Sequence, residues 1–345
     1  MKNRRISLVM FGIAALALFA CGGILGNAAS ASENYDPTQG EKVVIIFADE
    51  STPTQPRALA LIWAMERIAE ETGGRITVEY YPDSSLGTGA QQLQQLMDGS
   101  IQAASISVGL FSSYIPTMQV LQLPFLLNSY EKEFKAMHSP EGQALLDSLG
   151  EIGIKGLAYA ESGIRHFAHV SKPINTIEDL KGVKIRIVPS DVLLSAMTLL
   201  GASPMGLPYS EVYTALQNRV IDALEVNVLS MHTMKFYEVI KYFSYIGLYP
   251  FPIVYSMNKD FFDSLSPGDQ ALIEKWFKEG TVYCFNTTMP NAYEEALKAM
   301  YENGVVTNEI ADVEPFRKLM LPLYDEYAAL DPRIKDFIEM AVNLD

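Results

Sequence analysis

The stretch KVVIIFADESTPTQPRALALIWAMERIAEETGGRITVEYY, residues 42–81, holds one complete strand–helix–strand pattern. Its opening residues 42–48 are apolar and rich in β-branched side chains, which is typical of a buried strand. Residues 55–72 place apolar side chains at helical spacing, and a Gly-Gly pair ends the predicted helix. Residues 75–81 alternate in polarity as a second strand does. Strands that alternate with helices predict βαβ units and an α/β sheet.

The same alternation continues along the chain. Further strands are predicted at residues 101–108, 154–159, 164–170, 183–188, 220–225 and within 240–257, and further helices at 90–97, 191–200 and 210–218. From Pro267 the pattern changes, because residues 267–303 contain few helix breakers and predict one long helix. Helices at about 313–328 and 333–343 end the chain. Since 345 residues suffice for two domains, we predict two α/β lobes with a small-molecule site between them.

Residues 1–41 are predicted to form a signal peptide and a tether. A start with three basic residues precedes the apolar run 6–20, which is shorter than the roughly 20 residues of a membrane span. An uncleaved membrane anchor is the alternative. Residues 18–21, Leu-Phe-Ala-Cys, resemble a lipobox, which favours lipidation of Cys21. Ordinary cleavage after residues 29–31, Ala-Ser-Ala, is the other route to a mature protein.

Charge and cysteine content limit the classes of partner. The chain has 26 basic and 41 acidic residues and a formal net charge of -15, so its surface repels nucleic acid and anionic lipid. An anionic solute is also repelled at long range, so binding it requires locally placed cations. Besides Cys21 the chain has one cysteine, Cys284, so no disulfide is expected once Cys21 is lipidated or removed. We expect Cys284 to pack as a small apolar side chain.

The sequence lacks the motifs of common enzymes. It has no HExxH, GxSxG, CxxC or P-loop pattern, and Gly87-Thr88-Gly89 lacks the rest of a dinucleotide-binding fingerprint. His166 and His169 lie in a predicted strand, where three-residue spacing turns them to opposite sides, so they do not converge on a metal. We therefore predict a protein that is not an enzyme and needs no metal or cofactor. An exported hydrolase with a carboxylate pair stays open as an alternative, because such a pair is invisible in sequence.

Four segments of the chain carry a family resemblance. They are residues 73–104, 123–125, 163–190 and 204–227, the last followed by 235–242. Together they resemble the substrate-binding subunits of tripartite ATP-independent periplasmic (TRAP) transporters, of the dicarboxylate-binding-protein (DctP) type. The resemblance implies a two-lobed periplasmic-binding-protein fold of the α/β class, with a strand hinge and a long C-terminal helix spanning both lobes. On this basis we expect lobe I to comprise 42–162 plus 251–290, and lobe II 163–250 plus 291–345.

The resemblance also implies how the ligand is bound. In this family an arginine of the second lobe grips the ligand carboxylate, and it matches Arg186 of this sequence. The strand pattern agrees, because the apolar residues 183, 185 and 187 share one face and Arg186 lies on the other. A guanidinium offers a planar fork of N–H donors that fits both oxygens of a carboxylate, which a lysine ammonium does not.

Five further residues are expected at the site. Arg165 matches a second family arginine, and the alternative is a structural salt bridge. Tyr209 matches an aromatic position that packs against the ligand's carbon skeleton, and the alternative is core packing. Glu50 ends the first strand, where it can accept hydrogen bonds from ligand hydroxyls or cap a helix. Val226 replaces a ligand-facing Asn of the family, which puts the family's commonest solutes in doubt, and Asn227 is the candidate to compensate.

The sequence thus predicts a periplasmic solute-binding protein. It captures a small carboxylate-bearing solute and delivers it to TRAP membrane permease subunits. We expect a monomer that binds no nucleic acid and meets the membrane only through a lipid anchor. Besides the hydrolase, the other alternative is a sensor subunit that presents the solute to a membrane receptor.

Overall fold

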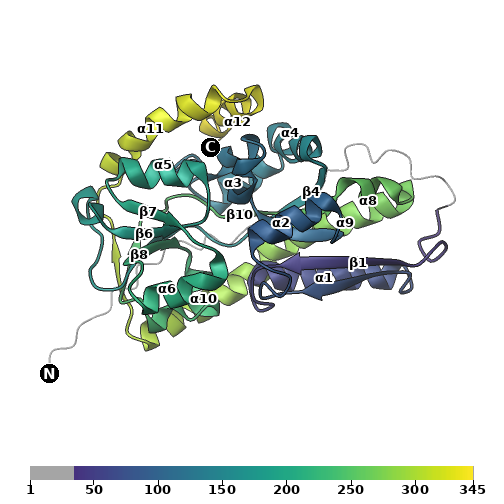
Figure 1. Ribbon diagram of the computed structural model, residues 1–345, viewed down its shortest axis with the longest axis horizontal. Coiled ribbons are helices and arrows are strands. Elements are labelled where there is room, and N and C mark those ends of the chain that lie inside the picture. Colours follow the sequence, from purple (N-terminus) through teal and green to yellow (C-terminus); the bar gives the residue numbers. More distant parts are fainter. Residues whose placement is uncertain (1–34, 345) are drawn as a thin grey trace.

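The computed structural model describes residues 35–344, which form two α/β lobes (Figure 1). Cys21, the predicted signal peptide and both predicted cleavage sites lie outside these residues. Within residues 35–344, no helix combines the length and the apolar character needed to cross a membrane.

The sheet of lobe I has the strand order β2–β1–β3–β10–β4. These strands are β1 Val43–Asp49, β2 Ile76–Tyr81, β3 Ala103–Ser107, β4 Ile154–Glu161 and β10 Pro252–Asn258. Strand β1 pairs in parallel with β2 and β3, as the βαβ pattern predicts. Strand β10 returns from the other lobe and runs antiparallel between β3 and β4. The sheet therefore needs a segment from late in the chain to be complete.

The sheet of lobe II has the order β11–β9–β5–β8–β6–β7. Its strands are β5 His166–His169, β6 Lys184–Ile187, β7 Ser203–Gly206, β8 Ala223–Val226, β9 Tyr242–Tyr245 and β11 Val306–Glu309. Strand β6 lies between β7 and β8 and is parallel to both. This central place fixes the direction of every β6 side chain, since strand neighbours on both sides hold its register.

Helices cover both sheets. They are α1 Pro56–Glu71, α2 Gly89–Asp98, α3 Tyr130–Met137, α4 Pro140–Ser148, α5 Asp191–Leu199, α6 Val212–Gln217, α7 Val228–Thr233 and α8 Lys259–Ser264. Helix α1 buries its apolar stripe, including Leu61 and Ile68, as its periodicity predicts. A capping box at Thr88 begins α2. The hydroxyl of Thr88 accepts from Gln91 N–H, and the side-chain oxygen of Gln91 accepts from Thr88 N–H.

Two chain segments cross between the lobes side by side. Residues 162–165 connect β4 to β5, and residues 246–251 connect β9 to β10. Backbone hydrogen bonds join the segments, from Arg165 N–H to the Tyr249 carbonyl (2.8 Å) and from Leu248 N–H to the Arg165 carbonyl (2.9 Å). The predicted strand hinge is therefore an antiparallel pair of connections.

A long helical segment runs behind both lobes, as predicted. It consists of α9 (Pro267–Tyr283), a π-helical turn (Cys284–Thr288) and α10 (Met289–Glu302). Helix α9 packs on α1 and β4 of lobe I, whereas α10 packs on α7 of lobe II. Pro290 lacks an N–H to donate, which fits an irregular turn just before it. Cys284 is buried in that turn, in agreement with its expected packing as a small apolar side chain.

The last two helices divide between the lobes. Helix α11 (Glu314–Ala328) packs on α5 of lobe II, but α12 (Pro332–Val342) packs on α3 and α4 of lobe I. This differs from the expectation that all of 291–345 belongs to lobe II. The physical reason is the apolar face of α12, which buries Ile334 and Phe337 against lobe I. The C-terminal helices thus form a second strap across the lobes (Figure 1).

Candidate functional site

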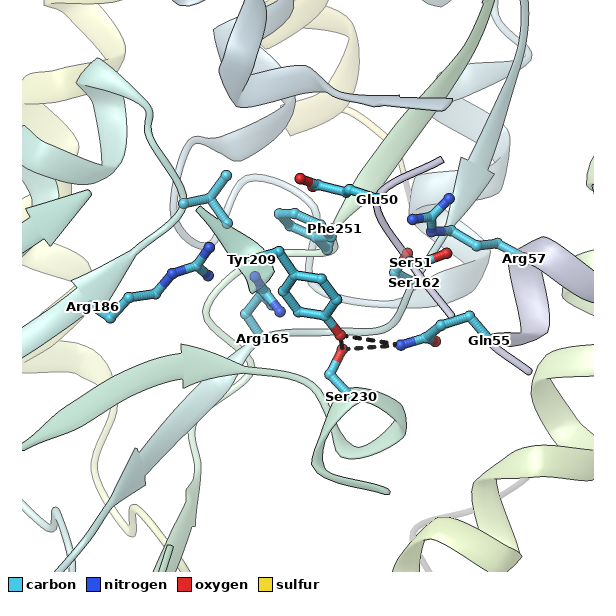
Figure 2. Close-up of a pocket in the computed structure, with 11 residues that line it drawn as sticks. Glu50, Ser51, Gln55, Arg57, Ser162, Arg165, Arg186, Tyr209, Ser230 and Phe251 are labelled. Atoms are coloured by element: carbon cyan, nitrogen blue, oxygen red, sulfur yellow. Dashed lines mark hydrogen bonds between the residues drawn. The ribbon is translucent and has the colours of Figure 1, made fainter. Parts of the chain in front are cut away.

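A cavity lies between the lobes, next to the crossing segments (Figure 2). Its empty space measures about 350 Å³, counting the part open to solvent. Its walls are formed by Glu50, Ser51, Gln55, Arg57, Ser162, Arg165, Arg186, Val188, Tyr209, Ser230 and Phe251. A second hollow of about 300 Å³ adjoins it and shares Glu50, Arg186, Val188 and Tyr209. Most of these residues are polar, so the cavity suits a small hydrophilic solute.

Arg186 projects from the central strand β6 into the cavity. The side chain is 3% exposed, and its Nε and Nη2 both donate to the Leu207 carbonyl, at 3.1 and 2.8 Å. The nearest carboxylate it meets is Glu225, with 4.0 Å between Nη1 and Oε1. Burial lowers the pKa of Arg186, although Glu225 partly opposes this. A buried guanidinium that is only loosely paired is a fitting receptor for an anion.

Arg165 lies at the same wall but is differently held. Its Nε lies 2.6 Å from Oε2 of Glu225, and its guanidinium carbon lies 3.9 Å from the ring centre of Phe251. Burial works against the charged form, but Glu225 and Tyr249 outweigh it and raise the pKa of Arg165. Arg165 therefore has the geometry of both roles considered from the sequence. It lines the cavity, and it forms a buried salt bridge with Glu225.

Glu225 bonds to several groups of this wall, although it is not among the residues that the sequence predicts at the site. Its Oε1 accepts from Val188 N–H (3.0 Å), and its Oε2 accepts from the Tyr249 hydroxyl (2.9 Å). The side chain is fully buried on β8. A glutamate inside the apolar strand of residues 220–225 is a sequence signal for a buried partner of opposite charge.

Arg57 forms the opposite end of the cavity and is also missing from the expected residues. It lies in the first turn of α1 and forms two bonds with Asp49, from Nη1 to Oδ2 (3.1 Å) and from Nη2 to Oδ1 (3.0 Å). The side chain is 5% exposed and that of Asp49 is fully buried. An arginine on the apolar face of a predicted helix, one turn before Leu61, is the signal that would have revealed this pair.

Tyr209 and Gln55 join the two lobes across the cavity. Gln55 of lobe I donates from Nε2 to Thr233 Oγ1 of lobe II at 2.6 Å. Longer contacts of 3.4 Å connect the same Nε2 to the Tyr209 hydroxyl and to Ser230 Oγ (Figure 2). The Tyr209 hydroxyl donates in turn to Ser230 Oγ at 3.1 Å. The lobes are therefore in direct hydrogen-bonded contact around the site.

Glu50 faces the cavity from the end of β1, near the start of α2. Gly89 leaves room for the carboxylate, because a Cβ at residue 89 would lie 2.6 Å from Oε2 of Glu50. Burial raises the pKa of Glu50, whereas Arg57 and Arg186 act to lower it. The side chain therefore lines the cavity beside the N-terminal end of α2, but Thr88 is the residue that caps this helix, and the ligand role of Glu50 stays a prediction.

Val226 and Asn227 do not line the cavity. Val226 is buried in the apolar core of lobe II. Asn227 caps α7, because its Oδ1 accepts from Ser230 N–H at 2.7 Å. Strand β8 ends here, so the side chains turn into the core and the cap instead of the cleft.

The two histidines of β5 accept hydrogen bonds from backbone N–H groups. His166 Nδ1 accepts from Ile246 and Gly247 N–H groups at 3.1 and 3.0 Å, and burial lowers its pKa to about 3. His169 Nδ1 accepts from Ser171 N–H at 3.0 Å. Throughout residues 35–344, no group of His, Cys, Asp and Glu side chains is placed to hold a metal ion.

Two α/β lobes with a polar, arginine-lined cavity between them form the arrangement expected of a solute-binding protein. A model of the bacterial extracellular solute-binding protein family 7 (DctP) matches residues 47–330, and the chain belongs to this family. The members of the family are binding proteins of TRAP transporters, not enzymes.

Three similar proteins illustrate the range of ligands. The C4-dicarboxylate-binding periplasmic protein DctP of Rhodobacter capsulatus is 31% identical over 313 residues, which cover 89% of this chain and 93% of that protein. A TRAP periplasmic solute-binding protein of Xanthobacter autotrophicus, solved with β-D-galacturonate, is 31% identical with a TM-score of 0.82, covering 86% of this chain and 98% of that one. A counterpart from Roseobacter denitrificans, solved with β-D-glucuronate, is 25% identical with a TM-score of 0.84, covering 88% and 100%.

Proposed function

We propose that this protein is the periplasmic solute-binding subunit of a TRAP transporter. It captures a small organic acid between its lobes and delivers it to the membrane permease subunits. Arg186 pairs with the ligand carboxylate, and Tyr209 packs against the carbon skeleton. The relatives described above bind a C4-dicarboxylate, galacturonate and glucuronate, which all carry a carboxylate for such a pair.

One observation carries this proposal. Three arginines line the cavity, and two of them have a carboxylate within 3.1 Å. Arg186 is the third, and its close contacts are to a carbonyl oxygen. A guanidinium has more N–H donors than one carbonyl can use, and Arg186 also lacks a close counter-charge of its own, because Glu225 is 4.0 Å away and pairs with Arg165. A bound carboxylate would satisfy both needs.

The test is calorimetric titration of Arg186→Ala and Arg186→Lys with D-galacturonate. We expect Arg186→Ala to weaken binding by roughly 2–5 kcal/mol, because the carboxylate would be buried unpaired. Arg186→Lys should recover part of the loss, since it restores the charge but not the planar fork. Lys184→Ala removes an equal charge from an exposed position of the same strand and should leave affinity unchanged. Equal affinity of wild type and Arg186→Ala would remove Arg186 from the site.

Export and anchoring form a second part of the proposal. The signal peptide directs the protein to the periplasm, and lipid at Cys21 holds the monomeric protein at the membrane surface. Mass spectrometry of the mature protein tests this. We expect a diacylated N-terminal cysteine in wild type and an unlipidated protein in Cys21→Ala. A mature wild-type N-terminus after Ala31 would contradict the lipid anchor and leave the periplasmic assignment intact.

A further inference from the structure

The charges around the cavity are balanced before any ligand binds. Among the described residues, the three arginines that line the cavity face the carboxylates of Asp49, Glu50 and Glu225. Asp49 and Glu225 are the close partners of Arg57 and Arg165. Arg186 and Glu50 remain, and they influence each other across the cavity without forming a salt bridge.

Arg57 is poorly placed to receive a second carboxylate. Both of its terminal nitrogens already bond to Asp49, and Nη1 also donates to Ser105 Oγ. Removing it from Asp49 would leave a fully buried carboxylate without its counter-charge, which is strongly unfavourable. The end of the cavity away from Arg186 therefore offers no free cation.

The same end offers unused hydrogen-bonding atoms. Ser162 Oγ and Gln55 Oε1 line the cavity, are buried, and have no hydrogen-bond partner among the described residues. Ser51 and Ser230 add hydroxyl groups to the wall. Ligand hydroxyls fit this set, because each can donate to Gln55 or Glu50 and accept from Ser162. Figure 2 shows Arg186 on one side of the cavity, Ser51, Ser162 and Gln55 on the other, and the carboxylate of Glu50 pointing into the space between them.

We infer that Glu50 is a charge filter that makes the site prefer hydroxylated monocarboxylates to dicarboxylates. The inference rests on the proposed function and narrows it. A solute with one carboxylate places it on Arg186 and directs its hydroxyls to Glu50 and the polar wall. A dicarboxylate brings its second negative charge toward Glu50 in a cavity with no unpaired cation besides Arg186 among the described residues.

The test compares D-galacturonate, malate and succinate by calorimetry at neutral pH. Galacturonate and malate both carry hydroxyls but differ in charge, and succinate is a dianion without hydroxyls. We expect wild type to bind galacturonate at least about tenfold more tightly than either dianion. Glu50→Gln removes the charge and keeps the shape, so galacturonate should bind about tenfold more weakly or worse, and malate more tightly. Glu79→Gln makes the same change at an exposed position of lobe I and should behave as wild type.

The outcomes separate this inference from the proposed function. If wild type binds malate or succinate as tightly as galacturonate, or if Glu50→Gln leaves their ratio unchanged, the charge filter is refuted while acid capture stands. If wild type binds none of the three acids, the proposed function fails and the inference fails with it. If Arg186→Ala binds them as wild type does, Arg186 is not the carboxylate receptor and the inference fails, while acid capture stands.

Discussion

Two buried acidic centres, one at the site and one at the hinge, avoid an unbalanced buried charge in different ways. At the site, Glu225 faces Arg165 and Arg186 and accepts from Val188 N–H and the Tyr249 hydroxyl. At the hinge, Glu133 of α3 and Glu161 of β4 face each other, and both are fully buried. The first centre is neutralised by cations, whereas the second holds two carboxyl groups that repel each other when both are charged.

The raised pKa values of the hinge pair favour a proton on one of its two carboxyl groups. Oε1 of Glu161 accepts from Phe251 N–H (3.1 Å) and from Gly163 N–H, which belong to the two crossing segments. Burial and the neighbouring Glu161 raise the pKa of Glu133 well above its ordinary value of 4.5. A protonated Glu133 can donate to the neighbouring Glu161, whose own pKa is raised by burial although Arg165 acts to lower it.

Three other groups complete the surroundings of the hinge centre. The Tyr130 hydroxyl of α3 accepts from Ile164 N–H at 3.2 Å, so α3 also holds a crossing segment directly. Cys284 faces the pair from the π turn, and burial raises the pKa of its thiol to about 12. Tyr130 also lies close to the pair. Burial raises the pKa of Tyr130, and the charges of Glu161 and Glu133 add to this effect. At the site, arginines balance the charge of Glu225, whereas at the hinge the raised pKa values favour a proton on one carboxyl of the Glu133–Glu161 pair.

The largest expected effect is at the site. Glu225→Gln should lower the free energy of unfolding by about 3–5 kcal/mol, because it leaves Arg165 and Arg186 buried without a counter-charge. Urea unfolding followed by circular dichroism measures this. Glu211→Gln, at an exposed position of lobe II, is the matched control. A loss below about 1 kcal/mol would contradict the comparison, because it would show that Arg165 and Arg186 do not need Glu225 as their counter-charge.

Glu161 should show an intermediate effect at the hinge. Glu161→Leu removes the acceptor of the Phe251 and Gly163 N–H groups, which should cost about 1–3 kcal/mol of unfolding free energy for each buried group left unpaired. Glu161→Gln keeps an acceptor oxygen and should be much less destabilised. Urea unfolding of both variants decides this, and equal losses would show that the carboxyl group does not hold the crossing segments.

The effect expected at Glu133 is a change of pH dependence. Because the pKa of Glu133 is raised in the folded protein, its contribution is complete below its ordinary value of 4.5 and is lost as pH rises toward the folded-state pKa. Glu133→Gln donates without titrating, so wild type should lose up to about 1.4 kcal/mol per pH unit relative to it in that range.

Melting temperatures from about pH 5 to pH 9 measure the difference. Glu131→Gln, two residues before Glu133 on the exposed side of α3, should follow wild type at every pH. Parallel profiles for wild type and Glu133→Gln would show that the pair holds no titrating proton in this range, and the contrast between the two centres would be lost.

Sequence periodicity determined most of the elements. The two-residue period of β6 placed Arg186 opposite the buried Ile185, and the long breaker-poor segment after Pro267 became α9 and α10. Periodicity alone assigns neither α3 nor α4, which are short. Their signals are the serine caps Ser129 and Ser139, each accepting a backbone N–H three residues ahead.

The fit of the family to residues 47–330 was also visible in sequence, because local motifs such as residues 163–190 keep their order and spacing. Export stays a prediction, and it rests on the composition of the first residues alone. These features depend on neighbours along the chain, whose geometry the backbone fixes within one turn of helix or one repeat of strand.

Only the tertiary structure decided which charges meet. Arg165 and Glu225 are 60 residues apart yet form an ion pair, and α12 packs on the lobe that the sequence did not assign to it. Glu133 and Glu161 look like ordinary surface acids in the sequence. Their burial follows from the packing of α3 on the hinge, and the energy of a charge depends on its three-dimensional surroundings rather than on its neighbours in the chain.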